Sequence, residues 1–306
     1  MEKRRLGNSD MYVSVLGLGC MSLGKDEKTA RNIIDAALAE GVNYFDTADL
    51  YDFGENEKMV GNALKEVREN VIIASKAGNR WNEKKDGWTW DPSKRYIKEA
   101  VKASLKRLHT DYLDLFQLHG GTMEDQIDET IEAFEELKSE GLIRYYGISS
   151  IRPNVIREYA AKSSLVSVMM QYSMLDRRPE EEMLPLLAER GISIVTRGSV
   201  AKGLLSGKEI SSIANKLQES GYLDYSYQEL QEILPAISEK LKGRQLLDAA
   251  LQYNLSQPAV AAVVTGASSP EQVRKNAKAV NAPALTAEEL EIIRSMTRAN
   301  LYKEHR

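Results

Sequence analysis

Four side chains in the first 119 residues combine the charges and acid groups needed to deliver a proton. Asp46 and His119 each end a short apolar segment, Lys76 comes just after another, and Tyr51 follows Asp46 by five positions. A free phenol, with a pKa of about 10, is a poor acid at neutral pH, and a nearby ammonium favours its ionised form. These residue types therefore predict a site that protonates an oxyanion as it forms.

Each of these residues also has an ordinary structural explanation. Asp46 with Thr47 is suited to capping a turn, and a single histidine such as His119 is more often structural than catalytic. The combination favours function, because three of the groups follow three consecutive apolar segments. In the catalytic interpretation, Asp46 holds Lys76 charged and His119 orients a substrate oxygen.

Apolar segments alternate with amphipathic segments along the whole chain, as expected for parallel strands joined by helices. The predicted strands are 13–18, 42–46, 71–75, 113–119, 143–149, 166–171, 192–196 and 260–265. The predicted helices are 26–40, 55–67, 93–108, 127–140, 153–161, 180–189, 245–255 and 270–279. We expect one α/β domain over residues 1–306, a (β/α)8 TIM barrel in which polar strand ends meet at one rim. Its additions are an N-terminal hairpin-like stretch, an insertion at 201–244 after the seventh strand, and a C-terminal helix at 288–297.

A doubly wound sheet is the alternative fold. The segment from Gly17 to Ser22 resembles a dinucleotide-binding fingerprint, but Ser22 stands where the third glycine or alanine belongs. Asp46 also lies too far along the chain to be the usual acidic residue of that motif. The barrel is therefore the preferred prediction.

Composition narrows the functional classes. The net charge is −4, and lysine and arginine are dispersed, which argues against nucleic-acid binding. No apolar segment is long enough to span a membrane, and the single cysteine, Cys20, allows no internal disulfide. The histidines His109, His119 and His305 form no ligand-spaced pair, so no metal is predicted. We expect a cytoplasmic protein, whose oligomeric state the sequence does not indicate.

Motifs along nearly the whole chain resemble the aldo-keto reductase family, including channel β-subunit-like members. They are GLGCMSLG, FDTADLYDFGENEKMVGNAL, IIASKAG, DYLDLFQLH, GLIRYYGISS, MMQYSMLDRR, KGLLSGK and TGASSPEQVRKNAKAV, in that order. The resemblance implies a bacterial NADPH-dependent oxidoreductase that reduces a small aldehyde or ketone. It also implies that Asp46, Tyr51, Lys76 and His119 are catalytic, with Tyr51 as the general acid.

The same resemblance indicates where the nicotinamide end of the cofactor binds. The corresponding positions are Cys20, Met21, Asp46, Ser149, Ser150, Gln171, Arg197, Gly198 and Ser199. Short polar side chains at strand ends also suit an amide partner, although they equally suit ordinary strand-end hydrogen bonds. Two positions depart from the family pattern: Ser150 stands where asparagine is common, and Arg197 replaces an aromatic ring that stacks on nicotinamide. A guanidinium plane can also stack.

The segment after the eighth strand matches the adenosine-phosphate end of the family's cofactor site. Its matching residues are Gly266, Ser268, Gln272 and Asn276. Relatives often place arginine or lysine here for a 2′-phosphate, whereas this chain has Ser268 and Gln272, with Arg274 and Lys275 nearby. NADPH is the predicted cofactor, with NADH as the alternative.

All three tryptophans fall between Trp81 and Trp90, in the loop after the third strand. This loop either lines an apolar substrate pocket or packs on the barrel. We expect Trp81 and Phe53 to bind substrate together with Tyr51 and His119. The tyrosine-rich segment 222–227 is a candidate cover for the cofactor or substrate.

Two other functions fit parts of the sequence. The resemblance to channel-associated members of the family implies, as a second function, a nucleotide sensor that binds NADPH with little turnover, and Arg197 favours it. A third is a phosphate-binding barrel isomerase or lyase with Lys76 as Schiff-base amine. A lysine held charged by Asp46 is a poor nucleophile, which disfavours the lyase.

Overall fold

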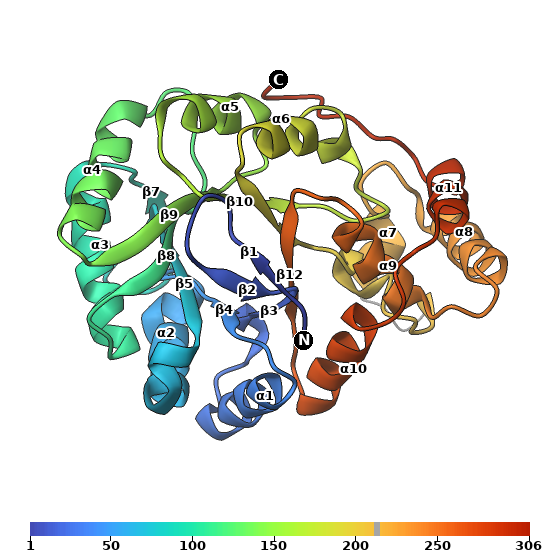
Figure 1. The fold of residues 1–306 in the computed structure, drawn as a ribbon, viewed down its shortest axis with the longest axis horizontal. Helices are drawn as coiled ribbons and strands as arrows, with labels where there is room; N and C mark the ends of the chain where they lie inside the picture. Colours follow the sequence, from blue (N-terminus) through green and yellow to red (C-terminus); the bar gives the residue numbers. More distant parts are fainter. Residues whose placement is uncertain (211–214) are drawn as a thin grey trace.

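The chain folds around a closed barrel of eight parallel strands, viewed in Figure 1 along the barrel. The computed structural model describes residues 1–210 and 215–306. The barrel strands are β3 (Leu16–Gly19), β4 (Tyr44–Asp46), β5 (Ile72–Ala77), β8 (Leu113–Leu118), β9 (Ile143–Ser149), β10 (Ser167–Gln171), β11 (Ser193–Arg197) and β12 (Val260–Gly266). Because β12 pairs with β3, the sheet has no free edge, and the predicted barrel is confirmed over an open, doubly wound sheet.

Helices surround the barrel on the outside (Figure 1). They are α1 (Glu27–Ala39), α2 (Glu55–Leu64), α3 (Lys94–Leu108), α4 (Ile127–Ser139), α5 (Pro153–Lys162), α6 (Met183–Glu189), α9 (Leu246–Leu255) and α10 (Pro270–Val280). Local chemistry sets their starts: Asp26 accepts a hydrogen bond from the Thr29 amide and Ser93 accepts one from the Tyr96 amide. Each predicted helix has its counterpart here, within a few residues at either end.

The N-terminal stretch forms an antiparallel hairpin, β1 (Lys3–Arg5) and β2 (Tyr12–Ser14), as predicted. Figure 1 shows the hairpin lying across one end of the barrel. Its side chains Leu6, Met11 and Val13 are buried in a core with interior residues of the barrel such as Leu115 and Val195. The hairpin therefore closes the amino-terminal end of the barrel with apolar side chains.

One predicted strand was wrong in its extent. The apolar segment 13–18 is divided between β2 and β3, and the chain changes sheet at Val15. The Ser14 hydroxyl donates to the Leu16 carbonyl, and the Ser14 amide donates to Asn43 instead of to a barrel strand. The spacing of apolar residues is the same whether a strand pairs in the hairpin or in the barrel. The sequence therefore did not indicate that residues 13–18 are divided between β2 and β3.

Two additions follow the carboxyl ends of barrel strands. The hairpin of β6 (Asn79–Trp81) and β7 (Trp88–Trp90) follows β5 and was predicted only as a loop. The predicted insertion after β11 contains α7 (Asn215–Ser220) and α8 (Tyr227–Lys240), and residues 211–214 of it lie outside the described residues. The predicted C-terminal helix is α11 (Ala287–Met296), which packs beside α8.

Nothing in the described ranges forms a helix that is long and apolar enough to cross a membrane. The organisation as a single domain over residues 1–306 stays a prediction.

Candidate active site

Asp46 and Lys76 form a buried ion pair at the carboxyl ends of β4 and β5. The Lys76 ammonium donates to Asp46 Oδ1 at 2.5 Å and to the Thr47 carbonyl at 2.7 Å. The two side chains are 5% and 1% exposed, respectively. Burial alone would lower the pKa of Lys76, but the charges of Asp46 and Tyr51 outweigh burial and raise that pKa. Lys76 is therefore held as an ammonium.

Tyr51 lies over this pair. Its ring centroid is 5.2 Å from the Lys76 ammonium nitrogen, and the Tyr51 amide donates to the Ala48 carbonyl at 3.1 Å. Tyr51 begins a short 3₁₀ segment, Tyr51–Gly54, in which Asp52 and Phe53 have φ angles of 46° and 53°. Non-glycine residues adopt this left-handed conformation at a cost. The loop is thus held in a strained shape that places the phenol beside the ammonium.

His119 faces Tyr51 from the end of β8. The two rings meet edge to face, with centroids 6.0 Å apart and planes at 85°. Burial lowers the pKa of His119 to about 3, helped by the positive charges of Lys76 and Arg197. Within residues 1–210 and 215–306, His119 Nδ1 has no hydrogen-bond partner. A neutral imidazole has one N–H donor and one acceptor, so His119 is suited to orient a polar substrate atom.

Gln117 is part of this cluster, although the sequence analysis did not identify it. Its side chain is fully buried, and its Nε2 donates to Asp46 Oδ2 at 3.3 Å. Asp46 is therefore held at both carboxylate oxygens, by Lys76 and by Gln117. Alternation along β8 was the available signal, because Gln117 precedes His119 by two positions and so shares its side of the strand.

The structure also brings Gln171 and Arg197 together, at the ends of β10 and β11. Arg197 donates to Gln171 Oε1 at 3.0 Å, and Gln171 Nε2 donates to Asp176 at 2.8 Å. The same amide nitrogen lies 3.4 Å from the hydroxyl of Tyr222, in the tyrosine-rich segment after β11. Ser149 ends β9, the neighbouring strand. These polar side chains at consecutive strand ends suit a ligand that carries a carboxamide.

Three of the other residues predicted to bind the nicotinamide end of the cofactor have buried side chains. Cys20 is completely buried, and burial raises the pKa of its thiol, whereas its neighbour Met21 is 66% exposed. Ser199 is 1% exposed and donates to Asn254 of α9. Ser150 is buried and accepts a hydrogen bond from the Arg152 amide. Their role in cofactor binding stays a prediction.

The predicted phosphate end lies where β12 meets α10. Ser268 donates to Gln272 Oε1 from both its amide and its hydroxyl, at 3.0 and 3.2 Å, and both residues are exposed. Asn276 is buried and donates to Thr265 of β12 at 3.0 Å. A Cβ atom at Gly266 would lie 2.4 Å from Ser22 Oγ. An exposed helix start beside a strand end where a Cβ atom would displace Ser22 is suited to bind an anionic group.

The loop after β5 was predicted either to line a substrate pocket or to pack on the barrel, and two of its tryptophans differ in this respect. The Trp81 ring packs edge-on against the Phe53 ring, with centroids 6.1 Å apart, next to the segment that carries Tyr51. Trp90 instead packs on the barrel: its indole nitrogen donates to Asp125 at 2.8 Å, and Cβ atoms at Gly78 and Gly120 would collide with its ring. Trp81 and Phe53 therefore form an aromatic pair beside the Tyr51 segment, and their contact with substrate stays a prediction.

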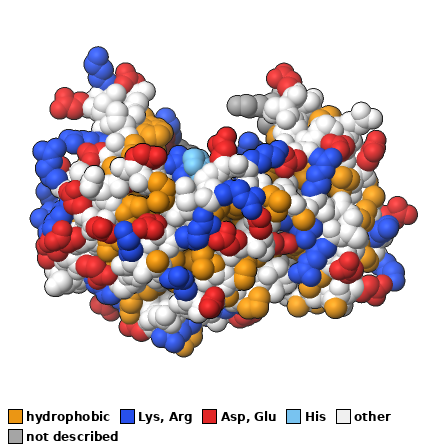
Figure 2. Space-filling model, turned by 90° about the horizontal axis from the view of Figure 1, so that it is seen from above, with side chains coloured by type: hydrophobic (Ala, Val, Ile, Leu, Met, Phe, Trp, Pro, Cys, Tyr) orange, Lys and Arg blue, Asp and Glu red, His pale blue; other side chains and the backbone are white. Residues whose placement is uncertain are grey.

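The cluster of Asp46, Lys76 and His119 lies at the end of the barrel opposite the closing hairpin. Both additions that follow β5 and β11 rise from this end, and Figure 2 shows the molecule hollowed between two projections.

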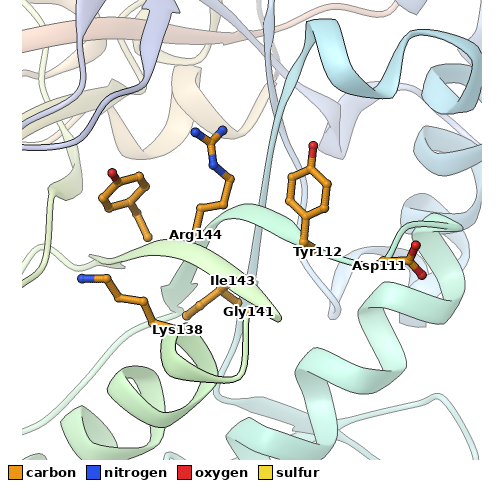
Figure 3. A pocket seen from close by; sticks show the side chains of 7 residues that line it. Asp111, Tyr112, Lys138, Gly141, Ile143 and Arg144 are labelled. Carbon is orange, nitrogen blue, oxygen red and sulfur yellow. The ribbon is translucent and has the colours of Figure 1, made fainter.

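A separate cavity of about 570 Å³, shown in Figure 3, lies where β8 and β9 begin and is lined by Tyr112, Arg144 and Tyr145, among others. None of the four catalytic candidates lines it. Over the described residues, no group of three or more potential metal ligands is present.

Comparison with known proteins identifies relatives over the full length. The sequence matches the model of the aldo/keto reductase family over residues 15–298. It is similar to the uncharacterized oxidoreductase YqkF of Bacillus subtilis, with 58% identity over 306 residues, which covers 100% of both chains. The structure is similar to the holo form of aldo-keto reductase AKR11C1 from Bacillus halodurans, with a TM-score of 0.95 and 57% identity over 100% of this chain and 99% of that chain.

Two more distant relatives bear on the type of activity. An NADH-specific methylglyoxal reductase of Escherichia coli is 33% identical over 310 residues, covering 92% of this chain and 94% of the relative. A probable voltage-gated potassium channel subunit beta of Arabidopsis thaliana is 30% identical over 312 residues, covering 94% of this chain and 93% of the relative. The expected resemblance to channel β-subunit-like members is thereby confirmed.

Proposed function

The chain belongs to the aldo/keto reductase family, and we propose that it reduces a small aldehyde or ketone to an alcohol, with NADPH as hydride donor and Tyr51 as general acid. One observation supports this most: the buried Asp46–Lys76 pair lies under the Tyr51 ring, and neutral His119 meets the edge of that ring. A charged lysine, a phenol and a neutral imidazole converge where a carbonyl oxygen would accept a proton.

The side chains divide the proton chemistry among them. Bound nicotinamide supplies the hydride that becomes the new C–H bond. Tyr51 gives its hydroxyl proton to the carbonyl oxygen, and the Lys76 ammonium stabilises the phenolate that remains. Asp46 keeps Lys76 charged, and an N–H of His119 orients the carbonyl oxygen toward Tyr51. In the reverse reaction, the Tyr51 phenolate takes the proton back from the alcohol.

For the cofactor, Ser149 and Gln171 would hold the carboxamide, and Arg197 would stack on the nicotinamide plane. Gly266, Ser268 and Gln272 would hold the phosphate end at the start of α10. The side chains of Ser268 and Gln272 are uncharged. The methylglyoxal reductase that is similar to this chain is NADH-specific. NADPH is our proposal and NADH the alternative. Titrating each cofactor against intrinsic tryptophan fluorescence decides between them.

The main test is Tyr51→Phe, which removes only the acidic hydroxyl. We expect a loss of at least about 10³-fold in kcat for reduction of 4-nitrobenzaldehyde, within the range that positioned acids supply. Cofactor affinity, measured by fluorescence, should stay within about twofold of the parent. A variant that reduces the aldehyde as fast as the parent would show that Tyr51 is not the acid.

A regulatory subunit that binds NADPH with little turnover is the second candidate. The similarity to a probable channel β subunit and the presence of Arg197 in place of an aromatic ring favour it. Steady oxidation of NADPH with a small aldehyde supports the enzyme, whereas tight binding with no turnover supports the sensor. The Schiff-base alternative is weakened, because the raised pKa of Lys76 keeps its amine protonated.

A further inference from the structure

A second buried acid lies in the loop that carries Tyr51. Asp49 is 2% exposed, and its Oδ2 accepts a hydrogen bond from the hydroxyl of Tyr96, on α3, at 3.0 Å. In the part of the chain that the structure describes, its other oxygen, Oδ1, has no partner. A buried carboxylate with one of its two oxygens unpaired is costly, whereas a protonated carboxyl is neutral and costs less.

The backbone around Asp49 connects the two central catalytic candidates. The Asp49 amide donates to the Lys76 carbonyl at 3.1 Å, and the Tyr51 amide donates to the Ala48 carbonyl at 3.1 Å. Asp49 thus fastens the loop to β5 two positions before the phenol. The Asp49 side chain and Tyr51 therefore belong to one short segment whose backbone is bonded to β5.

The groups that face Asp49 come from α2 and α3. Glu57, on α2, is fully buried and accepts hydrogen bonds from Ser75 at 2.5 Å and from Arg107, on α3, at 2.6 Å. The guanidinium of Arg80 lies 5.4 Å from the ring centroid of Tyr96 and pairs with Asp91, so these two charges lie beside the phenol that donates to Asp49.

These surroundings set the proton affinity of Asp49. Burial and then the negative charge of Glu57 raise the pKa of Asp49 from 3.8 to about 7, while Tyr96, Arg107 and the Leu50 backbone amide oppose the rise. The carboxyl is therefore protonated in mildly acidic solution and ionises near neutral pH. Ionisation adds a negative charge beside Glu57 and leaves Oδ1 as a charged, unpaired acceptor.

We propose that Asp49 is a positioning residue for Tyr51, and that carbonyl reduction depends on whether its carboxyl carries a proton. The loop is best packed when Asp49 is protonated. Its ionisation draws the carboxylate toward a donor or water and displaces the segment that leads to Tyr51. The kinetic part of this inference rests on the proposed role of Tyr51 as the acid.

Three variants test the inference through the pH profile of kcat/KM. Asp49→Asn keeps the shape and fixes the neutral state, so we expect it to lose a decline near pH 7 that the parent shows. Tyr96→Phe removes a hydrogen bond that stabilises the ionised form, so the decline should persist with its midpoint at a higher pH. Asp52→Asn, in the same loop but partly exposed, is the matched control and should leave the profile unchanged.

A second measurement does not depend on turnover. With ring-labelled tyrosine, the Tyr51 resonance, assigned by its absence in Tyr51→Phe, should shift near pH 7 in the parent and stay constant in Asp49→Asn. An identical shift in parent and Asp49→Asn, or no shift in the parent, overturns the inference. If the resonance shifts as expected but no carbonyl is reduced, the proposed function fails while the coupling of Asp49 to Tyr51 stands.

Discussion

The two halves of the barrel mouth are built differently. At the ends of β4, β5 and β8, Asp46, Lys76 and Gln117 are buried and already paired with one another. At the ends of β9 to β12, Gln171 and Arg197 are partly exposed and Ser268 is exposed. Arg197 donates to Gln171, Gln171 donates to the buried Asp176, and Ser268 donates to the exposed Gln272. The side chains of the first half already hold the arrangement that the proposed proton transfer needs. In the second half, side chains must give up hydrogen bonds within the protein to form hydrogen bonds with a ligand.

This difference predicts that substitutions in the first half change turnover and stability, and that substitutions in the second half change affinity. Each prediction below either separates the two halves further or shows that they behave alike.

The largest effect is expected for Lys76→Met. It removes the ammonium beside Tyr51 and leaves Asp46 buried without its charge partner, which destabilises a fold by about 3–5 kcal/mol. We expect kcat to fall by at least about 10³-fold and the urea midpoint to drop. Adding Asp46→Asn should restore much of the stability but none of the activity. Recovery of activity in the double variant would contradict a catalytic role for the pair.

The next largest effect is expected for Asp49, in the first half, which should make the free energy of unfolding depend on pH. The pKa of Asp49 is raised on folding, from 3.8 to about 7, so the folded state binds a proton that the unfolded state releases. Stability should therefore be fully present in acid and fall as the pH rises from about 4 to about 7, by up to about 4 kcal/mol relative to Asp49→Asn. Urea unfolding of both proteins across this range measures it. Parallel curves for the two proteins would show that Asp49 does not titrate there.

A smaller effect is expected at the second half, for Arg197→Ala. Loss of the guanidinium removes the proposed stacking surface and the hydrogen bond to Gln171, so NADPH should bind about tenfold more weakly. Single-turnover hydride transfer at saturating cofactor should change by less than about threefold. Arg197→Lys, which keeps the charge but not the plane, separates stacking from electrostatics. A large fall in the single-turnover rate would place Arg197 with the catalytic half.

The smallest effect is expected for Ser268→Arg. A positive charge at this exposed position should strengthen NADPH binding by about fivefold through the 2′-phosphate and leave NADH binding unchanged. Ser268→Gln adds comparable bulk without charge and is the matched control. Equal gains for both cofactors would show that the 2′-phosphate does not lie near Ser268.

The fold was predicted from the sequence, and the candidate site residues were grouped, for the same physical reason. In a parallel barrel, strand ends share one rim, so the types of residue that end successive apolar segments are informative. This is how Asp46, Lys76 and His119 could be grouped before any coordinates. The β6–β7 hairpin was not predicted, because Asn79 and Trp88 lie outside any long apolar alternation.

Other residues were missed because their roles depend on partners distant in sequence. Asp49 was not singled out from the sequence, because its hydrogen-bond partner Tyr96 is 47 positions away. Cys20 and Ser199 match the family's cofactor positions by sequence, yet both side chains are buried among protein atoms. Position in a motif does not state which way a side chain points.

The hairpin formed by β1 and β2 closes one end of the barrel, where the side chains of Leu6, Met11 and Val13 are buried. Asp46, Lys76 and Tyr51 lie at the opposite end of the barrel, at and after the carboxyl ends of β4 and β5. In the proposed reaction, cofactor, carbonyl and the proton that restores Tyr51 all enter from that end, so the ligand that lies deepest binds first and leaves last. An ordered sequence of arrival and departure is the kinetic signature we expect from a barrel closed at its base.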